Sequence, residues 1–298
     1  MSMTHIPVLL HEVVRTLQPK EGETFVDGTL GSGGHAEVIL NALGERGMFI
    51  GIDADADAVA AAKEKFKHDS RCIFVHENYA NLPEILRRLH IDRVDGILID
   101  LGFSSTQIDD ATRGFSFKFP DAVLDMRYGV SGDGEAAHDI VNTWDEKSLL
   151  LIFKKFGEER YAGRMARKII SERKKKHIQT VGELVNIVER VVPMPRGKRT
   201  FIHPATRIFQ ALRIAVNNEL ENLDTILGVL PEIVAPRGRV GIISFHSLED
   251  REIKVHFKSL VANKIASFIT KKPIIPSVSE VGENPRSRSA KLRAITIL

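Results

Sequence analysis

The sequence predicts an α/β fold, a mainly parallel, doubly wound sheet that contains an inserted all-helical domain and ends in an antiparallel strand. Three observations predict it. Short apolar, β-branched runs alternate with helical stretches at the start of the chain, and a glycine-rich turn follows the first run. The alternation then stops and resumes only near the C-terminus. Strands and helices in this order are typical of a parallel sheet.

The expected elements of the first part follow in order. Each apolar run ends near a polar residue and is followed by a stretch in which apolar residues have helical spacing. The expected strands are residues 25–27, Met48–Asp53, Cys72–His76 and Val94–Asp100, and the expected helices are residues 34–44, 56–67 and 81–90.

The alternation is interrupted between residues 104 and 203, where loop-like sequence precedes helical sequence at 147–156 and 159–176. A helical domain inserted into one sheet explains this order more simply than two consecutive domains. We expect the first part of the sheet domain at 1–103, the inserted helical domain at 104–206 and the second part at 207–298, with strands at 239–245 and 292–298 and a partner strand near 267–269.

Residues 205–223 have the apolar spacing of one helix. Its stripe is expected in the core and consists of Phe209, Leu212, Val216, Leu220 and Leu223. Arg207, Gln210 and Asn217 lie on a neighbouring face and are candidates to support a site.

The composition is that of a globular protein, because 43% of the 298 residues are hydrophobic and 27% are charged. No apolar run reaches the roughly 20 residues that a membrane-spanning helix needs, and no signal peptide is visible. The one cysteine, Cys72, cannot form an internal disulfide or a thiolate metal cluster. We therefore expect a cytoplasmic protein without membrane contact.

The net charge of +3 conceals an asymmetry. Residues 1–150 have 14 Lys and Arg against 25 Asp and Glu, whereas the rest of the chain has 28 against 14. The segment 154–207 has 15 basic and 5 acidic side chains. A basic surface that faces a polyanion and a solvated helix face explain this charge equally well.

The glycine turn, residues 27–36 (Asp-Gly-Thr-Leu-Gly-Ser-Gly-Gly-His-Ala), predicts a nucleotide site, since its glycines let the backbone turn sharply and approach a ligand. Gly31, Gly33 and Ala36 also fit a dinucleotide fingerprint, so the glycines alone do not identify the nucleotide. Asp27 favours S-adenosylmethionine, because a carboxylate is unfavourable beside a pyrophosphate but not beside a sulfonium and an ammonium group.

Three further side chains lie where the expected strands end, which is the edge at which open α/β sheets bind ligands. Asp53 is placed to accept hydrogen bonds from ribose hydroxyls, and Tyr79 to cover the face of an adenine. Asp100 would lie beside the transferable methyl group.

Several motifs then occur in order along the chain, among them Asp-Leu-Gly-Phe-Ser-Ser-Thr-Gln-Ile-Asp at 100–109 and Ser-Phe-His-Ser-Leu-Glu-Asp-Arg at 244–251. The others are at residues 5–13, 113–117, 124–127, 157–160, 203–214 and 284–289. Together they strongly resemble the bacterial 16S ribosomal RNA (cytosine-N4)-methyltransferase family.

The resemblance implies a class I methyltransferase with a Rossmann-like sheet and a helical domain inserted after the fourth strand. Its cofactor would be S-adenosylmethionine, and its substrate the N4 amino group of a decoding-centre cytosine at the P site of 16S rRNA, within the small ribosomal subunit. The oligomeric state stays open, a homodimer included. The resemblance implies cofactor contacts at Gly33, Gly34, His35, Asp53, Tyr79, Asp100 and Gln107, to which the glycine turn adds Asp27 and Gly31.

Asp100, Phe103 and His246 are the candidates for catalysis. The N4 lone pair of cytosine is delocalised into the ring, so acceptors on the amino protons would favour its attack on a methyl group, which needs positioning more than a strong base. Asp100 would be such an acceptor, unless it only holds the cofactor, and Phe103 would stack on the base. His246 would contact the base or its phosphate, although Ser247 and Asp250 suit a helix-capping box.

Basic residues predict contacts with RNA phosphates, which position RNA without specifying its sequence. Those at 160, 164, 167 and 168 share one side of a helix. The target base would have to be unstacked, which is easiest in single-stranded RNA. The predicted RNA-contacting residues are Arg160, Arg164, Arg167, Lys168, Arg199, Arg207, Arg286 and Arg288.

Two other functions stay open on the residues alone. An NAD-dependent dehydrogenase would use the same glycine turn, but it leaves Asp27 and the basic segment unexplained. A non-catalytic RNA-binding assembly factor would bind ribosomal subunits without transferring a methyl group. A Ser/His hydrolase is not favoured, because the pattern Gly-x-Ser-x-Gly is missing, and no Cys or His spacing requires a metal.

Overall fold

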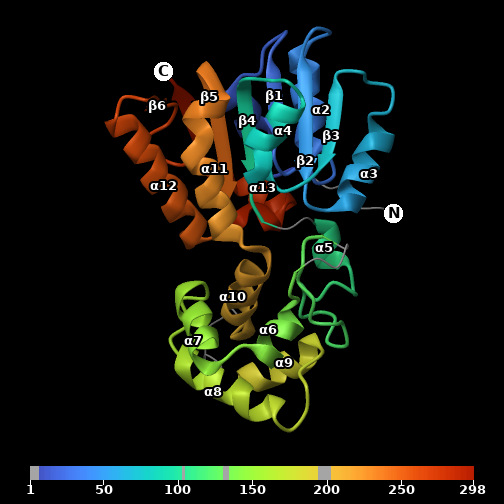
Figure 1. Cartoon of the computed structure of the whole chain (residues 1–298), viewed down its shortest axis with the longest axis vertical. Coiled ribbons are helices and arrows are strands. Elements are labelled where there is room, and N and C mark those ends of the chain that lie inside the picture. The colour runs from blue at the N-terminus through green and yellow to red at the C-terminus, as the bar shows by residue number, and fades with distance from the viewer. Residues whose placement is uncertain (1–6, 103–104, 130–133, 194–202) are drawn as a thin grey trace. The chain divides into compact units, whose positions relative to one another are not determined.

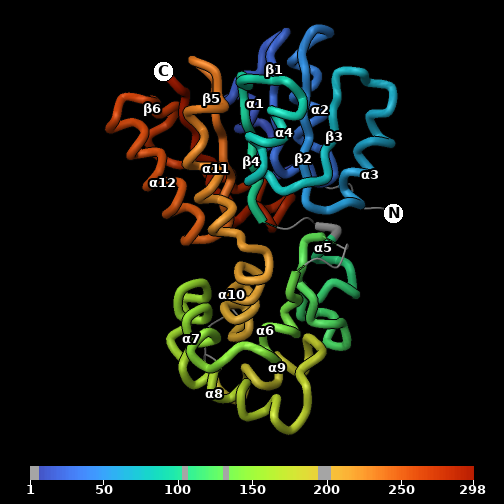
Figure 2. Tube along the Cα trace, viewed as in Figure 1, coloured from blue at the N-terminus to red at the C-terminus, as the bar shows by residue number. Residues whose placement is uncertain are grey.

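The computed structural model describes residues 7–102, 105–129, 134–193 and 203–298. The chain forms two compact units: the sheet unit, Met1–Gly102 with Leu220–Leu298, and the helical unit, Phe103–Glu219. The trace in Figure 2 leaves the sheet unit after the fourth strand and returns to it through helix α11. The helical unit is therefore an insertion into the sheet unit, in the part of the chain where strand patterns are missing.

The sheet unit contains a seven-stranded sheet in the order β3-β2-β1-β4-β5-β7-β6 (Figure 1). The first five strands are parallel, and β7 is antiparallel to both of its neighbours. This confirms the predicted fold class. The strands are β1 (Thr24–Asp27), β2 (Met48–Asp53), β3 (Cys72–His76), β4 (Val94–Asp100), β5 (Val234–Ser244), β6 (Ala266–Phe268) and β7 (Lys291–Ile297).

Both faces of the sheet are buried, because successive apolar residues of one strand enter different cores. In β4, Leu98 packs in one core and its neighbours Ile97 and Ile99 pack in the other. One core includes residues of α1 (Leu10–Leu17), α2 (Gly34–Leu43) and α3 (Ala56–Lys65), and the other includes residues of α4 (Leu82–Arg88), α11 (Glu219–Ile233) and α12 (Ser247–Ala262).

The parallel register brings the ends of the strands to one edge of the sheet, the carboxyl edge. Asp27 pairs with Gly51 and Asp53 with His76, while Asp100 pairs with Ile243. Polar residues that end different strands are thus assembled by backbone pairing alone.

The helical unit has a core of its own. Side chains from separate helices pack there, among them Phe153, Met165, Leu184 and Leu212, each of which is fully buried. Its helices are α5 (Ser105–Asp109), α6 (Ala137–Thr143), α7 (Glu146–Lys155), α8 (Ala162–Arg173), α9 (Val181–Glu189) and α10 (Ala205–Asn217).

The single helix expected at 205–223 is wrong. Helix α10 ends at Asn217, and Asn218 has a left-handed backbone (φ 50°) that no α-helix can continue through. The apolar stripe is divided accordingly, since Phe209 packs in the helical unit and Leu223 in the sheet unit. The chain returns to the sheet unit at residue 220, later than the expected residue 207.

Two shorter helical segments complete the sheet unit near the C-terminus, α13 (Val278–Glu283) and the 3₁₀ helix η2 (Pro285–Ser289). A further 3₁₀ helix, η1 (Tyr79–Asn81), directly follows the third strand. Among the helices in the described part of the chain, none combines the length and apolar character that crossing a membrane requires.

Candidate active site

The glycine turn is tied to the strands on both sides of β1. The N–H of Gly28 donates to the carbonyl of Leu98 at 2.8 Å, and the N–H of Leu30 donates to the carbonyl of Ile52 at 2.9 Å. Gly31 and Gly33 have left-handed backbones, with φ 50° and 71°, which favour glycine. The turn is therefore held rigidly at the carboxyl edge, directly before α2.

Asp27 ends β1 with a side chain that is 1% exposed. Its Oδ1 accepts a hydrogen bond from the N–H of Thr29 at 3.1 Å. Burial raises the pKa of Asp27 to about 7, and the negative charge of Asp53 acts in the same direction.

Asp53 occupies the corresponding position at the end of β2. Its two oxygens accept hydrogen bonds from the N–H of Gly31 at 2.7 Å and of Asp55 at 2.8 Å. Burial nevertheless raises its pKa. Each oxygen has a second lone pair, so the predicted contact with ribose hydroxyls stays open.

Asp100 ends β4, and Thr29 of the glycine turn holds its backbone: the N–H of Asp100 donates to Thr29 Oγ1 at 2.6 Å. The carboxylate atom Oδ1 of Asp100 is buried and has no hydrogen-bond partner among the described residues. Burial raises the pKa of Asp100 well above its ordinary value, and the nearby charges of Asp27 and Glu249 add to this effect.

Glu249 is a fourth carboxylate of this region, and sequence reasoning missed it. It is buried, and its Oε2 accepts hydrogen bonds from the N–H groups of Phe245 at 2.8 Å and His246 at 3.3 Å. The position of Glu249 three residues after His246 is the sequence signal that could have revealed this capping box.

His246 is the first residue after β5 and the N-cap of α12. Its Nδ1 accepts a hydrogen bond from the N–H of Glu249 at 3.4 Å, and its Nε2 lies 3.1 Å from Glu249 Oε1. The expected capping pair of Ser247 and Asp250 is wrong by one position, because Asp250 instead accepts hydrogen bonds from Lys291 and Arg293. His246 thus has a structural role beside any contact with substrate.

The next predicted cofactor residues, Gly34 and His35, contact the N-terminal segment. His35 is buried, with its Nε2 3.0 Å from the carbonyl oxygen of Val8. A Cβ at Gly34 would lie 2.3 Å from Cγ of Pro7. Packing therefore explains both residue types, and their contacts with a cofactor stay predictions.

Tyr79 begins η1 and packs, half-buried, against the core of the sheet unit.

Two predicted residues, Gln107 and Phe103, do not belong to the described part of the sheet unit. Gln107 lies in α5 of the helical unit, where its Nε2 donates to the carbonyl of Tyr128 at 3.3 Å. Phe103 lies outside the described residues.

The chemistry of the carboxyl edge follows from its charges. Asp27, Asp53 and Asp100 are close enough to raise one another's pKa values in pairs, and within the described residues none of them forms an ion pair with Lys or Arg. Such an edge repels a pyrophosphate and attracts a cationic ligand. The sulfonium and ammonium groups of S-adenosylmethionine fit this set of carboxylates. The buried Oδ1 of Asp100 is a hydrogen-bond acceptor that has no donor among the described residues.

The predicted RNA-contacting residues are divided between the two units. Arg164, Arg167 and Lys168 of α8 line an open hollow of the helical unit together with Arg190, which sequence reasoning did not single out although it belongs to the basic segment. Lys168 also pairs with Glu172 at 2.9 Å. Arg160 and Arg207 lie in the helical unit, Arg286 and Arg288 lie in η2 of the sheet unit, and Arg199 lies outside the described residues.

Polar residues of α8 and α10 hold the helical unit together. Arg173 donates to the carbonyls of Val141 and Trp144 at 3.0 and 2.6 Å. The amide of Gln210 donates to the carbonyl of Phe156 at 2.9 Å, and that of Asn217 donates to the carbonyl of Met126 at 2.8 Å. Gln210 and Asn217 thus have a role in the fold of the helical unit, and their expected support of a site stays a prediction.

Comparison with known proteins gives a match over nearly the full chain. The model of the MraW methylase family matches residues 2–298. The protein named ribosomal RNA small subunit methyltransferase H from Clostridium botulinum (strain Loch Maree / Type A3) is 45% identical over 308 residues, with 98% of each chain covered. The protein of the same name from Clostridioides difficile (strain 630) is 42% identical over 309 residues, also with 98% of each chain covered.

Among solved structures, one described as a putative rRNA-methylase from Clostridium thermocellum covers 99% of this chain and 100% of its own. The two share 15% sequence identity with a TM-score of 0.47, a likeness too low to bear on function.

Proposed function

The chain belongs to the MraW methylase family, and on this premise we propose that it transfers a methyl group from S-adenosylmethionine to the RNA of the small ribosomal subunit. The observation that carries the proposal is the group of buried carboxylates at the carboxyl edge, which favours a cationic cofactor. The two relatives named ribosomal RNA small subunit methyltransferase H support the substrate.

The proposed acceptor is the N4 amino group of a cytosine in 16S rRNA, and the proposed place of action is the cytoplasm. S-adenosylmethionine, when bound, supplies the electrophilic methyl group. The chain's own residues bind and orient: Asp27 faces positive charge, Asp53 accepts from ribose hydroxyls, and Tyr79 covers the adenine.

Asp100 has the role closest to the chemistry. Its Oδ1 is a buried acceptor that lacks a donor within the described chain, so it can accept a hydrogen bond from the amino group of the target base. The methylated nitrogen must lose one proton, and a carboxylate whose pKa is raised is suited to accept it. Thr29 keeps Asp100 in place, because its Oγ1 accepts a hydrogen bond from the backbone N–H of Asp100.

The test is transfer of tritium from methyl-labelled S-adenosylmethionine to small subunits isolated from cells that lack the enzyme. We expect label in 16S RNA and, after nuclease digestion, N4-methylcytidine by mass spectrometry. Subunit binding without label would instead identify an assembly factor. Saturable binding of NADH, with none of S-adenosylmethionine, would identify a dehydrogenase.

A further inference from the structure

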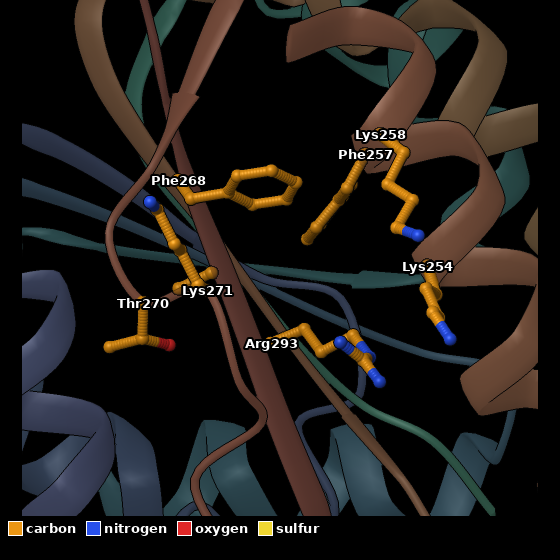
Figure 3. Close-up of a pocket in the computed structure, with 8 residues that line it drawn as sticks. Lys254, Phe257, Lys258, Phe268, Thr270, Lys271 and Arg293 are labelled. Atoms are coloured by element: carbon orange, nitrogen blue, oxygen red, sulfur yellow. The ribbon is translucent and has the colours of Figure 1, made fainter.

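Besides the basic surface of α8 in the helical unit, the sheet unit has a basic surface of its own. It lies far along the sequence from the glycine turn, and its residues are not among the predicted RNA-contacting residues. It is a hollow lined by Lys254, Phe257 and Lys258 of α12, by Phe268, Thr270 and Lys271 of β6 and the segment after it, and by Arg293 and Ala294 of β7. Figure 3 shows Lys254, Lys258 and Arg293 on one side of this basic hollow and Thr270 and Lys271 on the other. Its cations therefore come from three separate segments.

The three lysines of the basic hollow, unlike Arg293, have no local ion pair in the described part of the chain. Lys254 and Lys258 are four residues apart on α12, a spacing at which like charges repel each other. Lys254, Lys258 and Lys271 are exposed, and none of them forms an ion pair within the described part of the chain.

Among the described residues, Asp250 has the one carboxylate that bonds to the lining, and this carboxylate is shared between two cations. It accepts from Arg293 Nε at 2.7 Å and from Lys291 Nζ at 3.0 Å. This bond fixes the guanidinium of Arg293, whereas no carboxylate of the described residues pairs with the three lysines. A solvated helix face would not need cations from a strand and a loop to converge on one depression.

The apolar wall of the hollow restricts its ligand further. Phe257 is fully buried, and Phe268 is half-buried between the core and the hollow. Phe257 is therefore the floor of the hollow, and only Phe268 can offer part of its ring to a ligand. Lysines beside such a ring form a combination that binds single-stranded nucleic acid, since the cations contact the phosphates and the ring contacts a base.

We propose that the basic hollow of Lys254, Lys258, Lys271 and Arg293 binds a phosphodiester segment of the RNA substrate, apart from the segment that presents the target base. The proposal rests on the proposed function, because it takes RNA as the substrate. It implies that RNA binding is not confined to the helical unit, and that the antiparallel end of the sheet holds the RNA by charge rather than by sequence.

The test compares two triple variants of the full chain. Lys254→Gln/Lys258→Gln/Lys271→Gln removes the hollow's free cations. Its matched control, Lys20→Gln/Lys63→Gln/Lys67→Gln, removes the same charge from exposed positions of the same unit. Filter binding of unmodified 16S RNA, transcribed in vitro, is measured over a series of KCl concentrations. Calorimetry with S-adenosylhomocysteine checks that both variants are folded.

We expect the hollow variant to bind RNA roughly tenfold more weakly at low salt, and its salt dependence to be shallower by about 0.7 for each phosphate that it no longer neutralises. The control should keep the slope of the unaltered protein. Equal slopes for both variants would overturn the proposal. Polyglutamate serves as a probe for an acidic protein. If the hollow variant loses binding of polyglutamate but keeps the RNA slope of the unaltered protein, the proposal is also overturned, and the hollow is assigned to an acidic protein.

The proposed function is judged separately, by label transfer with the unaltered protein. Absence of label there would count against the methyltransferase, while the comparison of RNA slopes would still decide whether the basic hollow contacts RNA.

Discussion

Asp27 and Asp100 are carboxyl groups that the fold removes from water without pairing either one with Lys or Arg among the described residues. Burial without a countercharge is unfavourable for an ionised acid, which is why both pKa values are raised. The fold therefore maintains an acidic site whose ionised form is stabilised when a cationic ligand binds. Sequence reasoning found both residues because each ends a strand, but it could not predict their mutual repulsion.

The first prediction concerns pH and Asp27. Its pKa rises from 3.8 to about 7 on folding, so its contribution to the stability of the ligand-free protein is full below about pH 4 and is lost as the pH rises through 7. A cationic cofactor favours the ionised form, so its binding releases a proton near neutral pH. We expect affinity for S-adenosylmethionine to increase as the pH rises through 7, by calorimetry in buffers of different ionisation enthalpy.

Asp27→Asn should bind the cofactor at least tenfold more weakly, by roughly 1.4 kcal/mol, and should lose the proton release. Asp92→Asn, at an exposed position, is the control and should behave like the unaltered protein. Proton release that persists in Asp27→Asn would assign the titration to another group.

The second prediction separates the two roles of Asp100. We expect Asp100→Asn to be at least as stable as the unaltered protein without ligand, because the substitution removes a buried acid near Asp27 and Glu249. Its kcat should fall roughly 100-fold, the scale seen when one electrostatic stabiliser of a transition state is removed. Unfolding by urea, cofactor binding and single-turnover methylation measure these effects. Unchanged kcat with greatly weakened cofactor binding would mean that Asp100 only holds the cofactor.

At the scale of elements, the strands were predicted better than the helix ends. The bounds of β2, β3 and β4 follow directly from apolar runs that end at Asp or His. The break at Asn218 was missed because the apolar spacing continues through it, although the two halves pack in different cores. The expected capping box of α12 is one residue too late in the sequence, because His is an uncommon N-cap and does not mark the start of the helix.

The third prediction tests that cap. His246→Ala should destabilise the protein by about 1 kcal/mol, whereas His246→Asn, which has a side chain favoured at N-caps, should lose little. Urea unfolding of both variants measures the difference. If His246 acts only as a cap, His246→Asn will also methylate RNA within about threefold of the unaltered rate. A large loss of kcat at unchanged stability would instead return His246 to the catalytic group.

At the scale of the molecule, the charge asymmetry between the two halves of the sequence does not coincide with the two units. The sheet unit has 22 Lys and Arg against 24 Asp and Glu, and the helical unit has 20 against 15. The insertion itself could be predicted, because strand patterns are missing there. Its end could not, because the boundary falls between two consecutive helices. The C-terminal part of the sheet unit thus adds basic residues to a unit whose N-terminal part is acidic.

The last prediction uses this division. Every described cofactor candidate except Gln107 lies in the sheet unit, so S-adenosylhomocysteine should slow amide hydrogen exchange in the glycine turn, after β2 and at the end of β4. Exchange in α6 to α9 should not change, because those amides depend on the separate core of the helical unit. Protection of α5 would support the predicted contact of Gln107, and Gln107→Ala should then remove it. NADH is the control ligand and should protect none of these segments. Protection confined to the helical unit would contradict a cofactor site at the carboxyl edge, since the carboxylates that define that edge belong to the other unit.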